Sequence, residues 1–141
     1  MKIAALDIGD VWIGIALSDA LGILAKPYKT VKSHELYEAI NHLKDKEKVQ
    51  TIVVGHPRTL KGTSSEQTKK IEATYAQLKK DFPLIEFVLW DERLTSKQAD
   101  ALKRPRSPEE KQHAHSVAAA FILRTYLEYR SMMQSPQDEI E

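Results

Sequence analysis

The stretch ALDIGDVWIGIALSD, residues 5–19, contains two apolar runs on either side of a Gly-Asp pair. Aliphatic and β-branched residues dominate both runs, which is typical of strands, and Gly9-Asp10 is typical of a hairpin turn. We therefore expect strands over Lys2 to Ile8 and Val11 to Ser18, joined as a hairpin. Gly14, inside the second run, predicts a close backbone approach or a bulge.

An acid lies within the first of these apolar runs. Burying an ionised carboxylate costs several kcal/mol unless the group is paired or bound to a metal ion. Asp7 therefore has two interpretations. It caps the turn at Gly9-Asp10, as turn aspartates commonly do, or it belongs to a functional site. The spacing within the stretch does not choose between them.

The rest of the chain alternates between strand and helix patterns. A run over Ile23 to Val31 predicts a third strand, which Pro27 assigns to the periphery of the sheet. The later elements are expected as follows: a helix with Ser33 as its N-cap, a strand over Thr51 to Val54, a helix from a Ser64/Gln67 capping box to about Phe82, a strand over Ile85 to Trp90, a short helix from Thr95 to about Lys103, and a last helix from Pro108 to Tyr129. Because helices connect the later strands, those strands are expected to pair in parallel. The sequence predicts an α/β fold, in which helices flank a mixed five-stranded sheet built from an antiparallel meander plus parallel strands.

Composition limits the class of protein. With 141 residues, 42% of them hydrophobic, the chain fits one domain with a sizeable core. It contains no cysteine, which excludes disulfides and thiolate metal sites and fits a reducing compartment. The N-terminal residues match neither a signal peptide nor a membrane span, so we expect a soluble, cytoplasmic protein. We expect a single domain over residues 1–131, mildly basic and suited to an anionic partner, followed by a flexible acidic tail over residues 132–141.

A charged triplet follows the last predicted strand. In LWDERLTS, residues 89–96, an apolar run leads directly into Asp91, Glu92 and Arg93. Ligands of open α/β sheets bind at the carboxyl ends of the strands, so these side chains are candidates for a site. The alternative is a solvated strand end on which an acid pairs with Arg93.

Two other segments carry candidate residues. The loop GHPRTLKGT, residues 55–63, offers two cations and backbone N–H groups to phosphates, although it lacks the Gly-Lys-Ser/Thr ending of a P-loop and is equally consistent with an exposed basic loop. His113 and His115 precede an alanine run that allows a helix to pack tightly on a sheet. Residues two apart do not share a helix face, so this pair is not a zinc-type ligand pair, and exposed first-turn histidines are the alternative.

Taken in order, ALDIGDVWIGIALSD, IVVGHPRTLKGT, WDERLTS and HSVAAAFILRTYL resemble the bacterial family of Holliday-junction-resolvase-like proteins, also described as pre-16S rRNA nucleases. The similarity extends from Lys2 to about Leu127. It implies the ribonuclease H-like fold and a nuclease that acts on structured nucleic acid, with 5′-end processing of pre-16S rRNA as the expected role. The alternatives are a Holliday junction resolvase in DNA recombination and a weakly active or inactive nucleic-acid-binding assembly factor. An ATPase of the actin and sugar-kinase type shares the core topology but needs a second lobe, for which 141 residues leave no room.

The resemblance also implies which residues form the site. Members of this fold gather acidic residues from the first strand, a later strand and the last helix around Mg²⁺ or Mn²⁺. By matching motif, the expected catalytic and metal-binding residues are Asp7, Glu92 and His115. The expected nucleic-acid-binding residues are Arg58, Lys61, Thr63 and Arg93. The expected partner is pre-rRNA or branched DNA, and the protein is expected to be a monomer or homodimer.

The chain departs from the family pattern in three places, one of them the middle loop, where Thr59 and Lys61 stand in place of the typical Asn and Asp. His115 stands where an aspartate is usual, and imidazole binds Mn²⁺ but is a poor ligand for Mg²⁺. As a neutral ligand it attracts a second cation less strongly, and its ordinary pKa also suits a proton shuttle. At the hairpin turn, Gly9-Asp10-Val11 replaces the usual Gly-Thr-Lys/Arg, so a basic contact is missing there.

Overall fold

The computed structural model describes residues 1–56, 66–91 and 108–133, except for the side chains of residues 108–112. Its strands are β1 (Lys2–Ile8), β2 (Trp12–Ser18), β3 (Ala25–Lys32), β4 (Val49–His56) and β5 (Glu86–Asp91). Its helices are the 3₁₀ turn η1 (Ser33–Glu35), α1 (Leu36–Asp45), α2 (Glu66–Asp81) and α4 (Pro108–Met133). The predicted helix from Thr95 to Lys103 lies outside the described residues.

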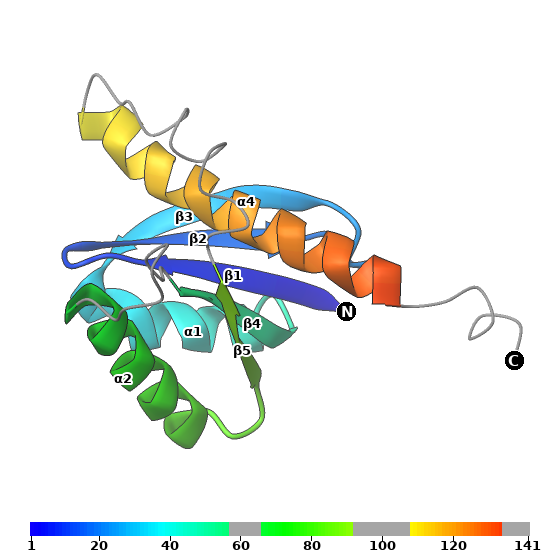
Figure 1. The fold of residues 1–141 in the computed structure, drawn as a ribbon, viewed down its shortest axis with the longest axis horizontal. Helices are drawn as coiled ribbons and strands as arrows, with labels where there is room; N and C mark the ends of the chain where they lie inside the picture. Colours follow the sequence, from blue (N-terminus) through cyan, green and yellow to red (C-terminus); the bar gives the residue numbers. More distant parts are fainter. Residues whose placement is uncertain (57–65, 92–107, 134–141) are drawn as a thin grey trace, which may run out of the picture.

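The strands form one mixed sheet in the order β3-β2-β1-β4-β5 (Figure 1). β1 and β3 both pair with β2 in antiparallel fashion, whereas β4 pairs in parallel with β1 and with β5. The predicted meander and the predicted helical crossovers are thus confirmed. β1 is the central strand, so the stretch around Asp7 lies in the middle of the molecule.

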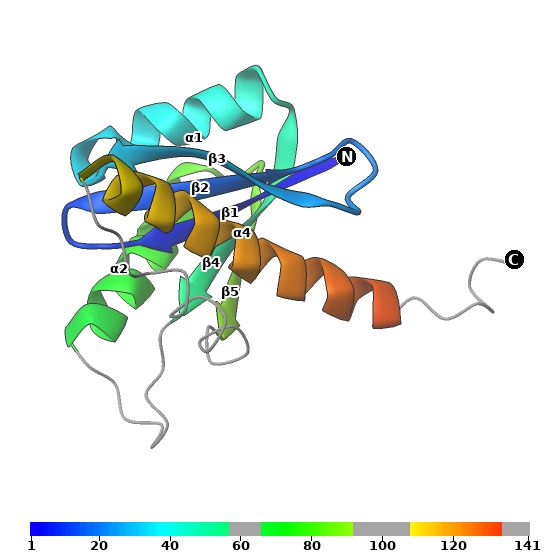
Figure 2. The ribbon, with the colours of Figure 1, turned by 90° about the horizontal axis from the view of Figure 1, so that it is seen from above.

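Helices cover both faces of the sheet. α1 and α2 lie on one face, and the long helix α4 crosses the other face over β1, β2 and β3 (Figures 1 and 2). Each interface has its own apolar cluster, in which aliphatic residues of the sheet contact the helices. The alanines that precede Phe121 lie in the interface between α4 and the sheet, where Ala119 is fully buried.

The alternation of side chains along β1 assigns each residue to a face. Ala4 and Leu6 belong to the cluster under α1 and α2, whereas Ile3 and Ala5 belong to the cluster under α4. Successive side chains of a strand point to opposite faces, so Asp7 continues the series on the α4 face. It is half-buried there, close to the carboxyl end of the strand.

Gly14 is the point at which α4 touches the sheet. It is the register partner of Asp7, and a Cβ atom placed on it would lie 1.9 Å from the carbonyl oxygen of His115 and 2.7 Å from the amide nitrogen of Ser116. The helix backbone therefore rests on the strand backbone, which confirms the predicted close approach. The α4 backbone therefore fills the space over Gly14.

Some predicted boundaries are wrong for identifiable reasons. β3 begins at Ala25 instead of Ile23, because the backbone N–H groups of Ile23 and Leu24 bind the Asp19 carboxylate at 2.7 and 3.1 Å and form part of a loop. α4 continues past Tyr129 to Met133, since the sequence places no glycine or proline before Pro136.

Ser33 is not the predicted N-cap. Its hydroxyl donates a hydrogen bond to the carbonyl oxygen of Asp10 at 2.9 Å, which ties the start of the helical segment to the β1–β2 turn. The first turn is the 3₁₀ turn η1, at whose start the Glu35 carboxylate accepts a 2.9 Å hydrogen bond from the N–H of Lys32.

The Gly14 contact predicts a large and specific loss of stability. Gly14→Ala should lower the free energy of unfolding by about 3 kcal/mol, because a methyl group cannot fit against the α4 backbone. Gly22→Ala is the matched control: a Cβ there would make only ordinary van der Waals contacts, 3.7 Å from the carbonyl oxygen of Met1, but φ is +70°, so the change should cost about 1 kcal/mol. Urea unfolding followed by circular dichroism measures both values, and equal losses in the two variants would contradict the assignment.

Candidate functional site

The opening stretch holds three aspartates, and the structure gives each a different environment. Asp19 organises the β2–β3 loop: its carboxylate accepts the two backbone hydrogen bonds described above, and its carbonyl accepts one from Gly22 at 3.1 Å. The hydrogen bond from the Ile23 N–H, followed by that from Leu24, lowers the pKa of Asp19 below its ordinary value. Asp10 is exposed and lies 3.6 Å from the ammonium of Lys70 on α2. Both of these acids have structural partners.

Asp7 differs from the other two. Its half-buried carboxylate makes no hydrogen bond or ion pair with any other residue that the structure describes. The turn that follows is closed by backbone atoms, through a 2.9 Å hydrogen bond from Gly9 N–H to the carbonyl oxygen of Trp12. The turn-capping interpretation of Asp7 is therefore wrong, and no residue in the described ranges pairs with this carboxylate.

His115 lies above the same corner of the sheet. Its backbone rests on Gly14, the register partner of Asp7, and its ring carbon Cε1 lies 3.9 Å from the position of a Cβ on Gly9. The side chain is half-buried, whereas that of His113 is exposed. The interpretation of both histidines as exposed first-turn residues is thus wrong for His115. The structure brings Asp7 and His115 to one end of the α4 face.

The other predicted site residues lie outside the described part of the chain; they are Arg58, Lys61, Thr63, Glu92 and Arg93. The strands that precede them are described. β4 and β5 run parallel to β1, and their last residues, His56 and Asp91, are register partners. Glu92 therefore follows directly from a strand that ends at the same sheet edge as the strand of Asp7. Among the described residues alone, no group of three acids or histidines is placed to hold a metal ion.

Two polar contacts that the sequence did not reveal support this edge. The Gln67 side-chain amide of α2 donates a 3.1 Å hydrogen bond to the carbonyl oxygen of Ile8, the residue after Asp7. On the opposite face of the sheet, the buried imidazole of His56 lies 2.9 Å from the Glu72 carboxylate of α2. Gln67 was expected as half of a capping box, and no spacing signal distinguishes that role from a contact to a distant strand.

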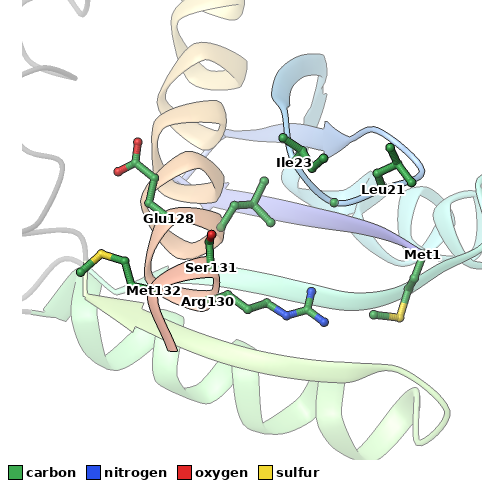
Figure 3. Close-up of a pocket in the computed structure, with 9 residues that line it drawn as sticks. Met1, Leu21, Ile23, Glu128, Arg130, Ser131 and Met132 are labelled. Carbon is green, nitrogen blue, oxygen red and sulfur yellow. The ribbon is translucent and has the colours of Figure 1, made fainter. Parts of the chain in front are cut away.

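A separate hollow of about 610 Å³ lies at the other end of the sheet (Figure 3). The β2–β3 loop residues Leu21 and Ile23, together with Met1, face the last turns of α4 there, including Arg130 and Met132. Met1 and Asp7 lie at opposite ends of β1, about 20 Å apart at 3.3 Å per residue. This hollow is therefore not part of the Asp7 site. None of the helices in the described ranges is long and apolar enough to cross a membrane.

The sheet order and the crossing helix define an α/β protein with the ribonuclease H-like fold. The fold is similar to that of Thermus thermophilus RuvC, with a TM-score of 0.58, 14% identity and coverage of 94% of this chain and 97% of that one. It is also similar to T. thermophilus RuvC in complex with a Holliday junction substrate, with a TM-score of 0.56, 16% identity and coverage of 93% and 96%.

The sequence comparison then gives the family. The chain belongs to the nuclease family described as "RuvX: Holliday junction resolvase", whose model matches residues 1–129. A relative from Rubrobacter xylanophilus is 38% identical over 128 residues, which are 90% of this chain and 92% of the relative. One from Clostridium botulinum is 39% identical over 138 residues, 91% of this chain and 97% of the relative. Both are named "Putative pre-16S rRNA nuclease". The resemblance noted in the sequence is confirmed.

The separate role of Asp19 is testable through pH. Its pKa is lowered in the folded state, so its contribution to stability is present above the ordinary pKa of about 3.9 and is lost as the pH falls through the folded value. The free energy of unfolding of Asp19→Asn should therefore depend less on pH than that of the wild type below pH ~4. Urea titrations between acidic and neutral pH measure this dependence, and superimposable pH profiles would exclude the proposed role.

Proposed function

We propose that this protein is a divalent-metal-dependent endonuclease that hydrolyses phosphodiester bonds in structured RNA, with 5′-end processing of pre-16S rRNA as its role. The observation that carries the proposal is Asp7: a half-buried carboxylate on the central strand, unpaired among the described residues and lying at the corner covered by His115. The names of the relatives support the choice of pre-16S rRNA. Such a substrate places the protein in the cytoplasm.

The chemistry of the donor set fits a metal ion. Asp7, Glu92 and His115 would supply two carboxylates and one imidazole, and hard divalent cations prefer oxygen ligands. A mixed oxygen and nitrogen set suits Mn²⁺ better than Mg²⁺. When bound, the metal supplies an activated water and stabilises charge on the phosphate. A neighbouring cation would also offset the charge of Asp7 inside the protein.

The residues of the chain then have distinct roles. Asp7 and Glu92 hold negative charge at the carboxyl end of two strands. His115 either completes the ligand set or accepts and donates a proton through its imidazole. Four residues would bind phosphates or sugars next to the cleaved bond and position the substrate; they are Arg58, Lys61, Thr63 and Arg93.

A second candidate substrate is a four-way DNA junction. It is favoured by the name of the matching family and by the similarity to a RuvC that was solved with a Holliday junction substrate. Incubation of the protein with precursor rRNA and with four-way junctions, each with Mg²⁺ or Mn²⁺, compares the two substrates directly. Cleavage of junctions alone would replace the RNA proposal, and binding without cleavage would favour the assembly-factor alternative.

The Asp7 proposal predicts a loss of activity without a loss of fold. Asp7→Asn should reduce the cleavage rate by at least about 100-fold, since even changes behind the ligand shell commonly cost 10–100-fold. Its free energy of unfolding should be equal to or above that of the wild type, because no described partner is left unpaired. The control is Asp10→Asn, which removes an exposed acid of the same hairpin and should leave cleavage near the wild-type rate. Unaltered cleavage by Asp7→Asn would refute the proposal.

The imidazole of His115 in the proposed ligand set predicts that the protein prefers Mn²⁺ to Mg²⁺. His115→Asp should raise the Mg²⁺-supported rate relative to the Mn²⁺-supported rate, because it replaces an imidazole by a carboxylate. His115→Ala should lower both rates. The ratio of initial rates in the two metals is the measurement, with His113→Ala, at the exposed histidine of the same helix, as the control. An unchanged ratio in His115→Asp would exclude His115 from the ligand set.

A further inference from the structure

An aromatic ring and a cation lie together beside the hairpin turn that follows Asp7. Trp12 is the first residue of β2, and Lys32 is the last residue of β3; the two are register partners. The Lys32 ammonium lies over the indole, 5.7 Å from the ring centroid. Trp12 is half-buried and Lys32 is exposed, so both side chains reach the surface.

The alternation along β2 places this pair on the α4 face. Gly14 contacts the α4 backbone and Ala16 belongs to the apolar cluster under α4, whereas Ile13 and Ile15 belong to the cluster on the other face. Trp12 lies two residues before Gly14 on the same strand, so both are on one face of the sheet. Gly14 is the register partner of Asp7, so Trp12 shares the face of Asp7.

The β1–β2 turn brings the pair close to the proposed site. The carbonyl oxygen of Trp12 accepts the hydrogen bond from Gly9, and the His115 ring lies over Gly9. Trp12 is thus next to the residues that cover the Asp7 corner, and Lys32 is one strand further out.

The two tryptophans of the chain have different environments. Trp90 donates its indole N–H to the Thr125 hydroxyl at 2.9 Å and packs edge-on against Tyr126, as a structural residue of the α4 interface. Within the described ranges, Lys32 is the one ring or hydrogen-bond partner of the Trp12 side chain. A large indole that is partly exposed and has a lysine ammonium over its ring resembles a contact surface more than a core residue.

We propose that Trp12 and Lys32 form a subsite for an unpaired nucleotide next to the cleaved phosphodiester bond. The indole stacks on the base, and the ammonium binds a flanking phosphate. Every base has a π-face, so stacking tolerates any sequence, and it requires a base that is not already stacked in a duplex. This inference rests on the proposed nuclease function and narrows its substrate to a single-stranded segment beside the structured part of the nucleic acid.

Fluorescence of Trp12 gives a direct test. In a Trp90→Phe background, Trp12 is the sole tryptophan of the chain, and titration with a single-stranded oligouridylate in EDTA reports binding without cleavage. We expect quenching of the emission by the single strand and much less quenching by a blunt RNA duplex of equal length. Equal or stronger quenching by the duplex would overturn the assignment to an unpaired nucleotide.

Substitutions separate stacking from charge. With affinity measured by fluorescence anisotropy of a labelled oligonucleotide, Trp12→Ala should weaken single-strand binding roughly tenfold, and Trp12→Phe, which keeps a ring, should recover most of it. Lys32→Gln should weaken binding and reduce the slope of log Kd against log salt by about one. The matched control is Lys29→Gln: it makes the same charge change on the same strand, but Lys29 pairs with Ile15 and faces α1. Equal effects of the two lysine variants, or an unchanged affinity of Trp12→Ala, would overturn the subsite.

The cleavage assay distinguishes failure of the subsite from failure of the proposed function. If the wild type cleaves RNA in an Asp7-dependent manner while Trp12→Ala and Lys32→Gln bind and cleave like the wild type, the subsite is wrong and the nuclease proposal stands. If the wild type neither binds nor cleaves any nucleic acid, both are wrong. Urea unfolding of Trp12→Phe and Lys32→Gln, which remove no described hydrogen bond of these side chains, shows whether the variants are folded.

Discussion

The contact of one helix backbone with one strand backbone determines the geometry of the site. α4 crosses the sheet with the carbonyl oxygen of His115 directly over Gly14, at a distance that no side chain on Gly14 would allow. Since Gly14 pairs with Asp7 in the register of β1 and β2, this contact also fixes where the helix lies relative to the acid. A larger residue at position 14 would lift α4 and move His115 away from the β1–β2 turn.

The central strand combines two demands that normally conflict. Residues Ile3 to Leu6 are fully buried between two apolar clusters, as the middle of a sheet requires, and Asp7 follows them in the same alternation. The acid is tolerated because it lies near the end of the strand, where it is half-buried and keeps part of its hydration. The rigid core thus holds a carboxylate at the sheet edge, and the rigidity is what a positioned ligand for a cation needs.

Local patterns predicted the architecture because strands and helices are specified by neighbouring residues. The apolar alternation and turn residues of 5–19 were sufficient for the hairpin, and the β-branched run before Gly55 was sufficient for a buried strand. The environment of Asp7 could not be predicted in this way, since it depends on a helix more than one hundred positions later in the chain. The contact of Lys32 with Trp12 was equally hidden. A register shift between Ile15 and Ala16 changes which residue of β3 lies opposite Trp12 on β2.

The charges at this end of the α4 face bear on the proposed chemistry. The exposed Asp10 is partly neutralised by Lys70, and Lys32 adds a positive charge beside Trp12, so Asp7 is the acid of the hairpin whose charge has no described counterpart. An imidazole at position 115, in place of a third carboxylate, lowers the negative charge that an approaching phosphate backbone meets. The same change weakens the attraction for a second cation, because a neutral ligand contributes no charge of its own. In the proposed site this balance would favour binding of the polyanion over tight binding of two metal ions, and the cation affinity would then depend mainly on the proposed ligands Asp7 and Glu92.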